Sequence, residues 1–164
     1  MRPIAGLLAL GLLLLGVRSA LADWRYTTWR MTPQEVVEAS SGEAELLDSP
    51  VSTPSGLTKA AVGRYETGPF GFEVSFLFRT VDEALELERV SLFLLDNSAA
   101  SRLYQSLVDS YGEPETSEIR PIQDGVSQTA QWKDPDSSNL ISYFGIGDYY
   151  AVEYAPIRPA GDGF

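Results

Sequence analysis

Few side chains in this sequence can act as a base, a nucleophile or a soft metal ligand. The 164 residues include no histidine and no cysteine, and Lys59 and Lys133 are the only lysines. This composition excludes imidazole bases, Ser–His and Cys–His pairs, and metal sites built from histidine or thiolate. A Ser–Lys dyad is chemically conceivable, but Lys59 lies in a strand pattern and Lys133 precedes a turn, so we expect both on the surface. We expect no catalytic residue, no metal and no cofactor.

A cluster of acidic residues offers a route to catalysis without histidine. Its members are Asp82, Glu83, Glu86 and Glu88. A pair of carboxylates can hydrolyse a glycosidic bond. A run of charges is usually a solvated face, however, and the sequence indicates no apolar pocket that would raise a carboxyl pKa. A carboxylate-based hydrolase is therefore the least favoured function.

The segment Asp134-x-Asp136-x-Ser138 has the opening spacing of a calcium-binding loop. Its sixth and twelfth positions are Asn139 and Gly145, where an EF-hand requires glycine and a bidentate glutamate. Because two strand patterns flank the segment, we interpret it as a hairpin turn.

Aromatic side chains near the C-terminus are the best candidates for a contact surface. Trp and Tyr bury a large area and keep a polar tip, which favours them in binding surfaces. Neighbours on a strand point to opposite faces, so the adjacent rings of 143–144 and 149–150 must place some rings on the face away from the helices. The predicted binding residues are Trp132, Tyr143, Tyr149, Tyr150 and Tyr154.

Residues 1–22 have the pattern of a secretory signal peptide. Arg2 supplies a positive charge, residues 4–17 are an unbroken apolar run, and Ala20-Leu21-Ala22 is a cleavage motif. A helix over 4–17 would reach only about 21 Å, short of the roughly 30 Å hydrocarbon core, so an uncleaved membrane anchor is the less favoured alternative. We expect cleavage after Ala22 and a periplasmic or secreted protein.

Cleavage would leave one acidic domain. Loss of Arg2 and Arg18 takes the formal net charge from −11 to −13. Such a surface repels phosphate backbones and anionic lipids, so we expect no nucleic-acid partner and no stable membrane insertion after cleavage. Without cysteine there are no disulfides and no cysteine-linked lipid anchor. We expect a single α+β domain over residues 23–156 and a flexible tail over residues 157–164.

Two helices are predicted from their boundary residues. Thr32 and Glu35 form a capping box around Pro33, so a short helix starts there and stops near residues 40–42. A longer helix is capped by residue 97 or 98, has one apolar face, and ends before Gly112.

Six strands complete the predicted fold. The clearest is 70–79, where aromatic and polar residues alternate; 57–66 and 85–95 flank it, and 126–133, 140–146 and 149–156 follow the second helix. In 85–95 the apolar phase shifts near Glu88-Arg89, which predicts a bulge or a turn there. Residues 40–56 are predicted to be an exposed loop. We expect an antiparallel sheet of about six strands with two helices on one face, in the order α-βββ-α-βββ.

Two helix-boundary motifs resemble those of small exported α+β domains. The motifs are Met31-Thr32-x-x-Glu35-Val36 and Leu107-x-x-x-Tyr111-Gly112-x-Pro114. Similar ones occur in outer-membrane-assembly lipoproteins of the SmpA/OmlA type and in the β-lactamase inhibitory protein fold. Arg30 stands where that pattern has glycine, and the lipoprotein cysteine is missing. The resemblance implies a protein-binding module in envelope assembly or in inhibition.

Together these features favour a non-catalytic exported module that presents its outer sheet face to an envelope protein or peptide. A binder of small molecules or glycans, which stacks its ligand on the same rings, is the alternative.

Overall fold

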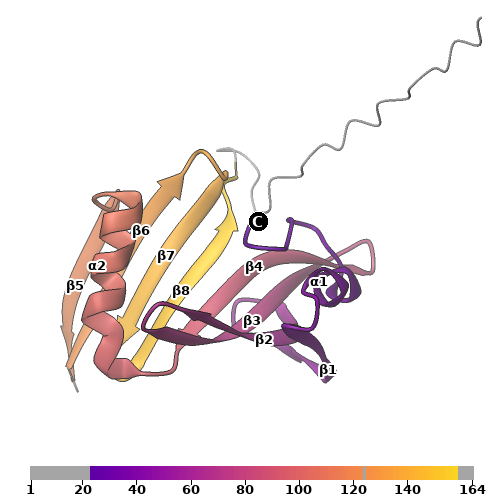
Figure 1. Ribbon diagram of the computed structural model, residues 1–164, viewed down its shortest axis with the longest axis horizontal. Helices are drawn as coiled ribbons and strands as arrows, with labels where there is room; N and C mark the ends of the chain where they lie inside the picture. The colour runs from indigo at the N-terminus through magenta and orange to yellow at the C-terminus, as the bar shows by residue number, and fades with distance from the viewer. Residues whose placement is uncertain (1–22, 124, 159–164) are drawn as a thin grey trace, which may run out of the picture.

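The structure is a computed structural model, and it describes residues 23–123 and 125–158. These residues form one eight-stranded antiparallel sheet, in the order β1-β2-β3-β4-β8-β7-β6-β5, together with two α-helices (Figure 1). In chain order the elements are α1 (Pro33–Ala39), β1 (Ala44–Ser52), β2 (Thr58–Thr67), β3 (Phe70–Val81), β4 (Ala84–Leu94), a 3-10 turn η1 (Asn97–Ala99), α2 (Ala100–Tyr111), β5 (Thr116–Ile122), β6 (Gly125–Asp134), β7 (Asn139–Ile146) and β8 (Tyr149–Pro156).

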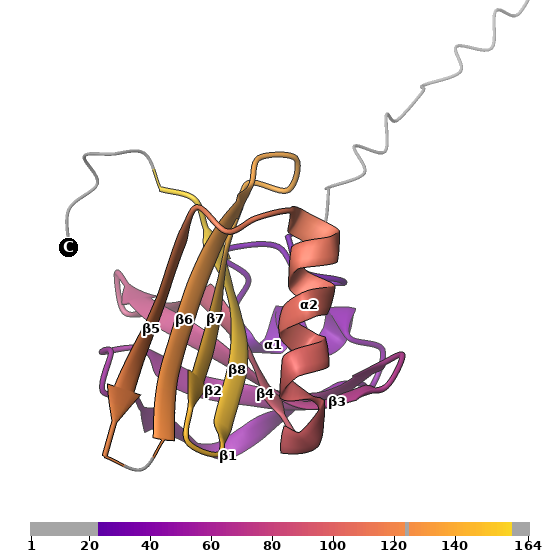
Figure 2. The ribbon, with the colours of Figure 1, turned by 90° about the vertical axis from the view of Figure 1, so that its left-hand side faces the viewer.

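Each half of the chain contributes one helix followed by four strands. The halves join where β4 pairs with β8, with Val90 opposite Tyr154 and Leu92 opposite Val152. The sheet is strongly twisted, as antiparallel sheets of this size are. As a result β5–β8 stand nearly upright in Figure 2, while β1–β4 cross behind them.

The predicted six-stranded sheet in the order α-βββ-α-βββ is wrong, because the described residues form eight strands in the order α-ββββ-α-ββββ and are mostly sheet. The two missed strands are the sheet's edges, β1 and β5. β1 lies inside residues 40–56, which the sequence predicted to be an exposed loop. All seven residues of β5 are exposed, and most of β1 is too. Neither strand has an alternating buried face that the sequence could reveal. Backbone pairing to β2 and β6 holds them in the sheet instead.

The start of α1 confirms the predicted capping box. The backbone N–H of Glu35 donates to Thr32 Oγ1 at 3.3 Å, and the backbone N–H of Thr32 donates to Glu35 Oε2 at 2.7 Å. The longer helix begins differently from the prediction, because Asp96 accepts from the Ser98 N–H at 3.0 Å and caps η1 instead. Its predicted end at Gly112 is confirmed, with a φ of 79° that favours glycine.

The bulge predicted near Glu88-Arg89 is also confirmed. Leu77 pairs with Arg89 while Phe78 pairs with Leu87, so Glu88 has no opposite residue in the β3–β4 ladder. This extra residue lets apolar side chains on both sides of it share one face of β4, although their spacing in the sequence changes phase.

Both helices cover the same face of the sheet. α1 buries Pro33 and Val36, while α2 buries Ala100, Leu103 and Leu107. Apart from Pro33, these residues belong to one hydrophobic cluster with one face of the sheet. The buried aromatic members from the sheet are Phe72, Phe76, Phe78, Trp132 and Tyr143. The opposite face carries no helix among the described residues, and we call it the open face. No helix in the described ranges is long and apolar enough to cross a membrane.

The described chain is tied to the sheet at both ends. The Asp23 N–H donates to the Thr27 carbonyl at 2.8 Å, and Asn139 Nδ2 donates to the Asp23 carbonyl. Ile157, the first residue of the predicted flexible tail, donates its N–H to the Ser138 carbonyl at 2.9 Å, and Arg158 pairs with Glu88. The predicted signal peptide (residues 1–22) and residues 159–164 lie outside the described residues.

Trp132 tests the assignment of the covered face. Its side chain is 1% exposed, and its Nε1 donates to the Gly112 carbonyl at 2.8 Å, joining β6 to the end of α2. Trp132→Ala should lower the free energy of unfolding by about 3–5 kcal/mol. Tyr149→Ala, at a half-exposed ring of the open face, should lower it by about 1 kcal/mol. Urea unfolding measures both, and equal losses would contradict the assignment.

Candidate functional site

The structure does not bring the five predicted binding residues together on one surface. Because side chains alternate along a strand, Trp132, Tyr143, Tyr150 and Tyr154 all point to the helix-covered face. Of the five, Tyr149 alone lies on the open face, where it is 48% exposed.

Two of these rings are core residues. Tyr143 is 2% exposed and meets the Tyr104 ring of α2 edge-on, with centroids 5.3 Å apart. Trp132 lies beside the same ring, at 6.0 Å. Burial raises the pKa of Tyr143 to about 12, and the neighbouring hydroxyls of Tyr150 and Tyr104 contribute further. Neither Trp132 nor Tyr143 can meet a partner unless the helix moves away.

Tyr150 and Tyr154 are half-buried on the same face. Tyr150 lies over Gly145, where a Cβ would stand 3.0 Å from its ring, so the glycine makes room for this side chain. The Tyr154 hydroxyl lies 3.4 Å from that of Tyr111 at the end of α2, and its ring lies 6.5 Å from Trp24. Burial, followed by the effect of Tyr111, raises the pKa of Tyr154.

The open face carries its own group of aromatic rings at the seam between the two halves. Phe93 of β4 lies opposite Ala151 of β8, which lies opposite Phe144 of β7. The Tyr149 ring packs on Phe93 with centroids 5.2 Å apart and planes inclined by 40°. We call Phe93, Phe144 and Tyr149 the open-face cluster. Ile146, 46% exposed, pairs with Tyr149 and extends the cluster toward β6.

Burial and the nearby Glu153 carboxylate raise the pKa of Tyr149, while a hydrogen bond with Ser91 acts in the opposite direction. The phenol is therefore neutral at neutral pH. It offers a partner both an apolar ring and a hydroxyl that can donate a hydrogen bond.

A row of small polar side chains runs beside the open-face cluster. Cross-strand neighbours place one member on each of five adjacent strands, namely Ser75, Ser91, Glu153, Ser142 and Gln131. Gln131 Nε2 donates to Ser142 Oγ at 3.3 Å, and Arg89 pairs with Glu153 at 3.1 Å. The open face thus places a compact apolar cluster beside a row of polar side chains, and protein-binding surfaces also combine apolar and polar groups.

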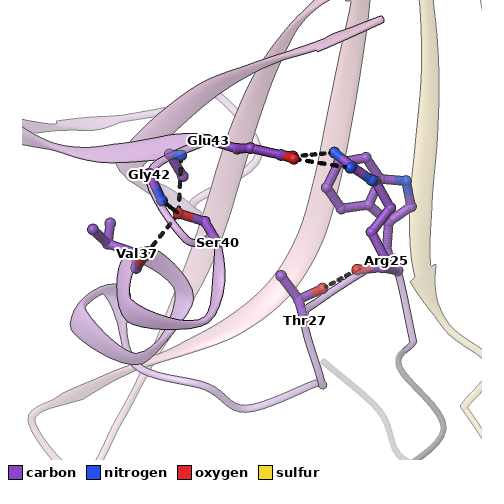
Figure 3. Close-up of polar contacts among 8 residues, drawn as sticks. Arg25, Thr27, Val37, Ser40, Gly42 and Glu43 are labelled. Carbon is purple, nitrogen blue, oxygen red and sulfur yellow. Dashed lines mark hydrogen bonds and ion pairs between the residues drawn. The ribbon is translucent and has the colours of Figure 1, made fainter. Parts of the chain in front are cut away.

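The other aromatic group near the N-terminus already holds a cation of the chain itself. The Arg25 guanidinium lies 4.4 Å from the centroid of the Tyr65 ring, 5.4 Å from that of Tyr26 and 5.7 Å from that of Trp24. It also pairs with the Glu43 carboxylate, at 3.2 Å for one of the two contacts (Figure 3). Burial, with a contribution from Glu43, raises the pKa of Tyr26 to about 12 against the opposing effect of Arg25. These rings serve internal packing.

Hydroxyl groups fix the two segments that carry this ion pair. Thr27 Oγ1 donates to the Trp24 carbonyl at 2.8 Å. Ser40 Oγ donates to the Val37 carbonyl at 2.7 Å and accepts from the Ala44 N–H at 3.0 Å (Figure 3). These contacts hold Arg25 and Glu43 facing each other, so the group seals the end of the core.

The carboxylates singled out in the sequence lie in turns, in ion pairs or, for Glu86, on strand β4 opposite Arg79. Asp82 and Glu83 form the β3–β4 turn with φ of 46° and 69°, and Glu88 pairs with Arg79 and Arg158. Asp134 accepts from the Asp136 N–H at 3.1 Å and from Ser137 Oγ at 2.6 Å, as a hairpin turn requires. Within the described ranges, no three acidic side chains gather in a way that could hold a metal ion.

A shallow groove of about 640 Å³ lies at the β1–β3 end of the sheet. Charged side chains of both signs line it, namely Glu43, Glu45, Lys59, Arg64 and Glu73. Lys133, the other lysine, forms an ion pair with Glu115 at 2.8 Å.

Comparisons with known protein families, with curated proteins and with solved structures found no match. The resemblance to SmpA/OmlA lipoproteins and to the β-lactamase inhibitory protein fold therefore stays a prediction.

Sequence reasoning missed Phe93 and Phe144 as candidate residues. A signal for Phe93 was present, because Val90, Leu92 and Leu94 assign the even positions of β4 to the core and so point Phe93 the other way. Phe144 is the neighbour of Tyr143 and takes the face that Tyr143 leaves. The sequence did not say which of these two faces is covered.

The buried phenol of Tyr143 makes stability depend on alkaline pH. Below pH 10, the ordinary pKa, both folded and unfolded chains keep the proton, so the stability is fully present. Between about pH 10 and about pH 12 the unfolded chain ionises first, so the free energy of unfolding falls. Tyr143→Phe should make this fall shallower in urea unfolding measured from pH 9 to 12. An unchanged slope would show that Tyr143 titrates normally.

Proposed function

We propose that the protein is an exported, non-catalytic module that binds another protein through the open face of its sheet. The observation that carries this proposal is the one-sided cover of the sheet. Both helices pack on one face, and the other presents Phe93, Phe144 and Tyr149 beside the seam, near the β7–β8 turn. Phe93 and Phe144 are half-buried and Tyr149 is 48% exposed, so the three rings form a contiguous apolar patch that a partner can cover.

The chemistry of the chain supports binding over catalysis. No histidine or cysteine is available, Asp82 and Glu83 lie in a turn, and Glu88 is in an ion pair with Arg79. The signal-peptide pattern of residues 1–22 supports a place in the periplasm or outside the cell. The partner we propose is an envelope protein or peptide, in line with the resemblance of the two helix-boundary motifs.

The geometry of the rings favours a protein over a glycan. Stacking on a sugar needs a flat and accessible ring, whereas Tyr149 and Phe93 are inclined to each other by 40°. Phe144 is separated from Phe93 by Ala151, which is fully buried between them. The inclined rings of the open-face cluster, with the polar row beside them, suit the interlocking side chains of a protein surface.

Two substitutions on opposite faces test the proposal. Tyr149→Ala removes a half-exposed ring from the open face, whereas Leu46→Ala removes an apolar side chain of similar exposure (44%) from β1. An envelope extract of the source organism, passed over each immobilised variant, should contain a protein that native and Leu46→Ala columns retain. The Tyr149→Ala column should lose it, with affinity reduced at least tenfold.

Equal retention by all three columns would contradict the proposal. The glycan alternative is distinguished by tryptophan and tyrosine fluorescence during titration with cell-wall fragments. A saturable response that Tyr149→Ala removes would replace a protein partner with a carbohydrate one.

A further inference from the structure

The outer edge of β5 is open in the described structure. β5 pairs with β6 on one side and ends the sheet on the other, and all seven of its residues are exposed. Unpaired edges template pairing with another strand, and proteins usually protect them with charges, bulges or proline. The other edge, β1, has such protection in a register irregularity between Leu46 and Val51. β5 has no bulge in its ladder, although it carries the charges of Glu118 and Arg120 and the proline Pro121.

The sequence of β5 is complementary to itself in an antiparallel arrangement. Its seven residues are Thr-Ser-Glu-Ile-Arg-Pro-Ile, with Ile119 at the centre and Glu118 and Arg120 on either side. If two copies of β5 met about a twofold axis at Ile119, each Glu118 would lie opposite Arg120 of the other copy. In the single chain these two side chains pair along the strand at 2.5 Å, and both are mostly exposed, at 53% and 70%.

Other registers are disfavoured by charge. Sliding one strand by two residues in one direction places Glu118 opposite Glu118 of the other copy. Sliding it by two residues in the other direction places Arg120 opposite Arg120. Like charges directly opposite each other destabilise a sheet, and opposite charges stabilise it. The charge pattern therefore selects the register centred on Ile119.

The outward-facing backbone groups of β5 also match a twofold axis at Ile119. Pro121 has no N–H, and an edge strand turns such a residue's nitrogen away from its neighbouring strand. Ser117 and Ile119, at the same phase as Pro121, therefore present their N–H and C=O groups outward. Two Ile119 residues can bond to each other reciprocally, and each Ser117 N–H can donate to the opposing Pro121 carbonyl. The pairing thus has about four backbone hydrogen bonds available.

Apolar side chains beside the axis would be covered in this arrangement. Ile119 is 65% exposed and Val126, which lies opposite Pro121 on β6, is 53% exposed. All three project on the helix side of the sheet, beyond the part that α2 covers. Across the twofold axis, each of these side chains would meet either the same residue of the other copy or a residue diagonally opposite. Both kinds of neighbour are close enough for apolar side chains to touch.

We propose that two copies of this chain associate by antiparallel pairing of their β5 strands about Ile119. The pairing would form a continuous sixteen-stranded sheet with one open face. This dimer proposal depends on the β5 edge alone, so it can be tested independently of the partner proposed for the open-face cluster.

Charge reversal tests the register. Sedimentation equilibrium of the exported protein should show a monomer–dimer equilibrium. Arg120→Glu should weaken it about tenfold, because two opposite-charge pairs become two like-charge pairs. The double variant Glu118→Arg, Arg120→Glu exchanges the charges and should restore the dissociation constant to within about threefold of the native value. A monomer at all concentrations up to about 1 mM, or a dimer that ignores these reversals, would overturn the proposal.

A single cysteine tests the geometry, since the chain has none of its own. Residues that face each other in a hydrogen-bonded antiparallel pair have Cα atoms about 5.5 Å apart, within reach of a disulfide. Ile119→Cys should therefore oxidise to a covalent dimer, and adding Arg120→Glu should slow this reaction. Ile146→Cys is the matched control, because it is exposed (46%) on β7 away from the edge. Equal cross-linking of the two cysteine variants would also overturn the proposal.

Discussion

The pairing of β4 with β8 holds the two halves of this protein together, and the remaining structure depends on it. The two strands lie far apart in the chain, yet Val90, Leu92, Val152 and Tyr154 meet across the seam and point to one side. Because the ladder fixes this phase, both helices must pack on the same side to bury one common core. A shift of one residue at the seam would turn the Phe93 face of one half toward the helices of the other. The seam therefore decides which face is covered and which is open.

The helices cover only one face of the sheet, and this has two consequences. The open face keeps aromatic rings at the seam, where the halves meet, and a serine-rich row beside them. The sheet also ends in two edges of different character, of which β1 is irregular while β5 is regular and self-complementary in charge. Pairing at β5 would place two open faces side by side in one assembly. A partner with repeated or extended binding surfaces would then gain affinity from contact with both copies.

Features fixed by local chemistry were predictable from the sequence. The capping box at Thr32 and Glu35, the alternation of β3, the bulge at Glu88 and the end of α2 at Gly112 each depend on residues close together in the chain. The edge strands β1 and β5 were missed because they are almost fully exposed and show no alternation between apolar and polar residues. Four of the five predicted rings lie on the covered face and Tyr149 lies on the open one, which the sequence could not decide because strand parity separates two faces without identifying the covered one. That choice is made by long-range packing against α2, which Trp132 and Tyr143 contact.

We conclude that the sheet has one covered and one open aromatic face, and hydroxyl-radical footprinting can distinguish the two. After correction for intrinsic reactivity, Tyr149 should be oxidised several times faster than Tyr143 and Trp132, which are 2% and 1% exposed. Unfolding in urea should abolish the difference. Oxidation of Tyr143 and Trp132 in the folded protein at the rate of Tyr149 would contradict the claim, because it would mean that the helices do not cover that face.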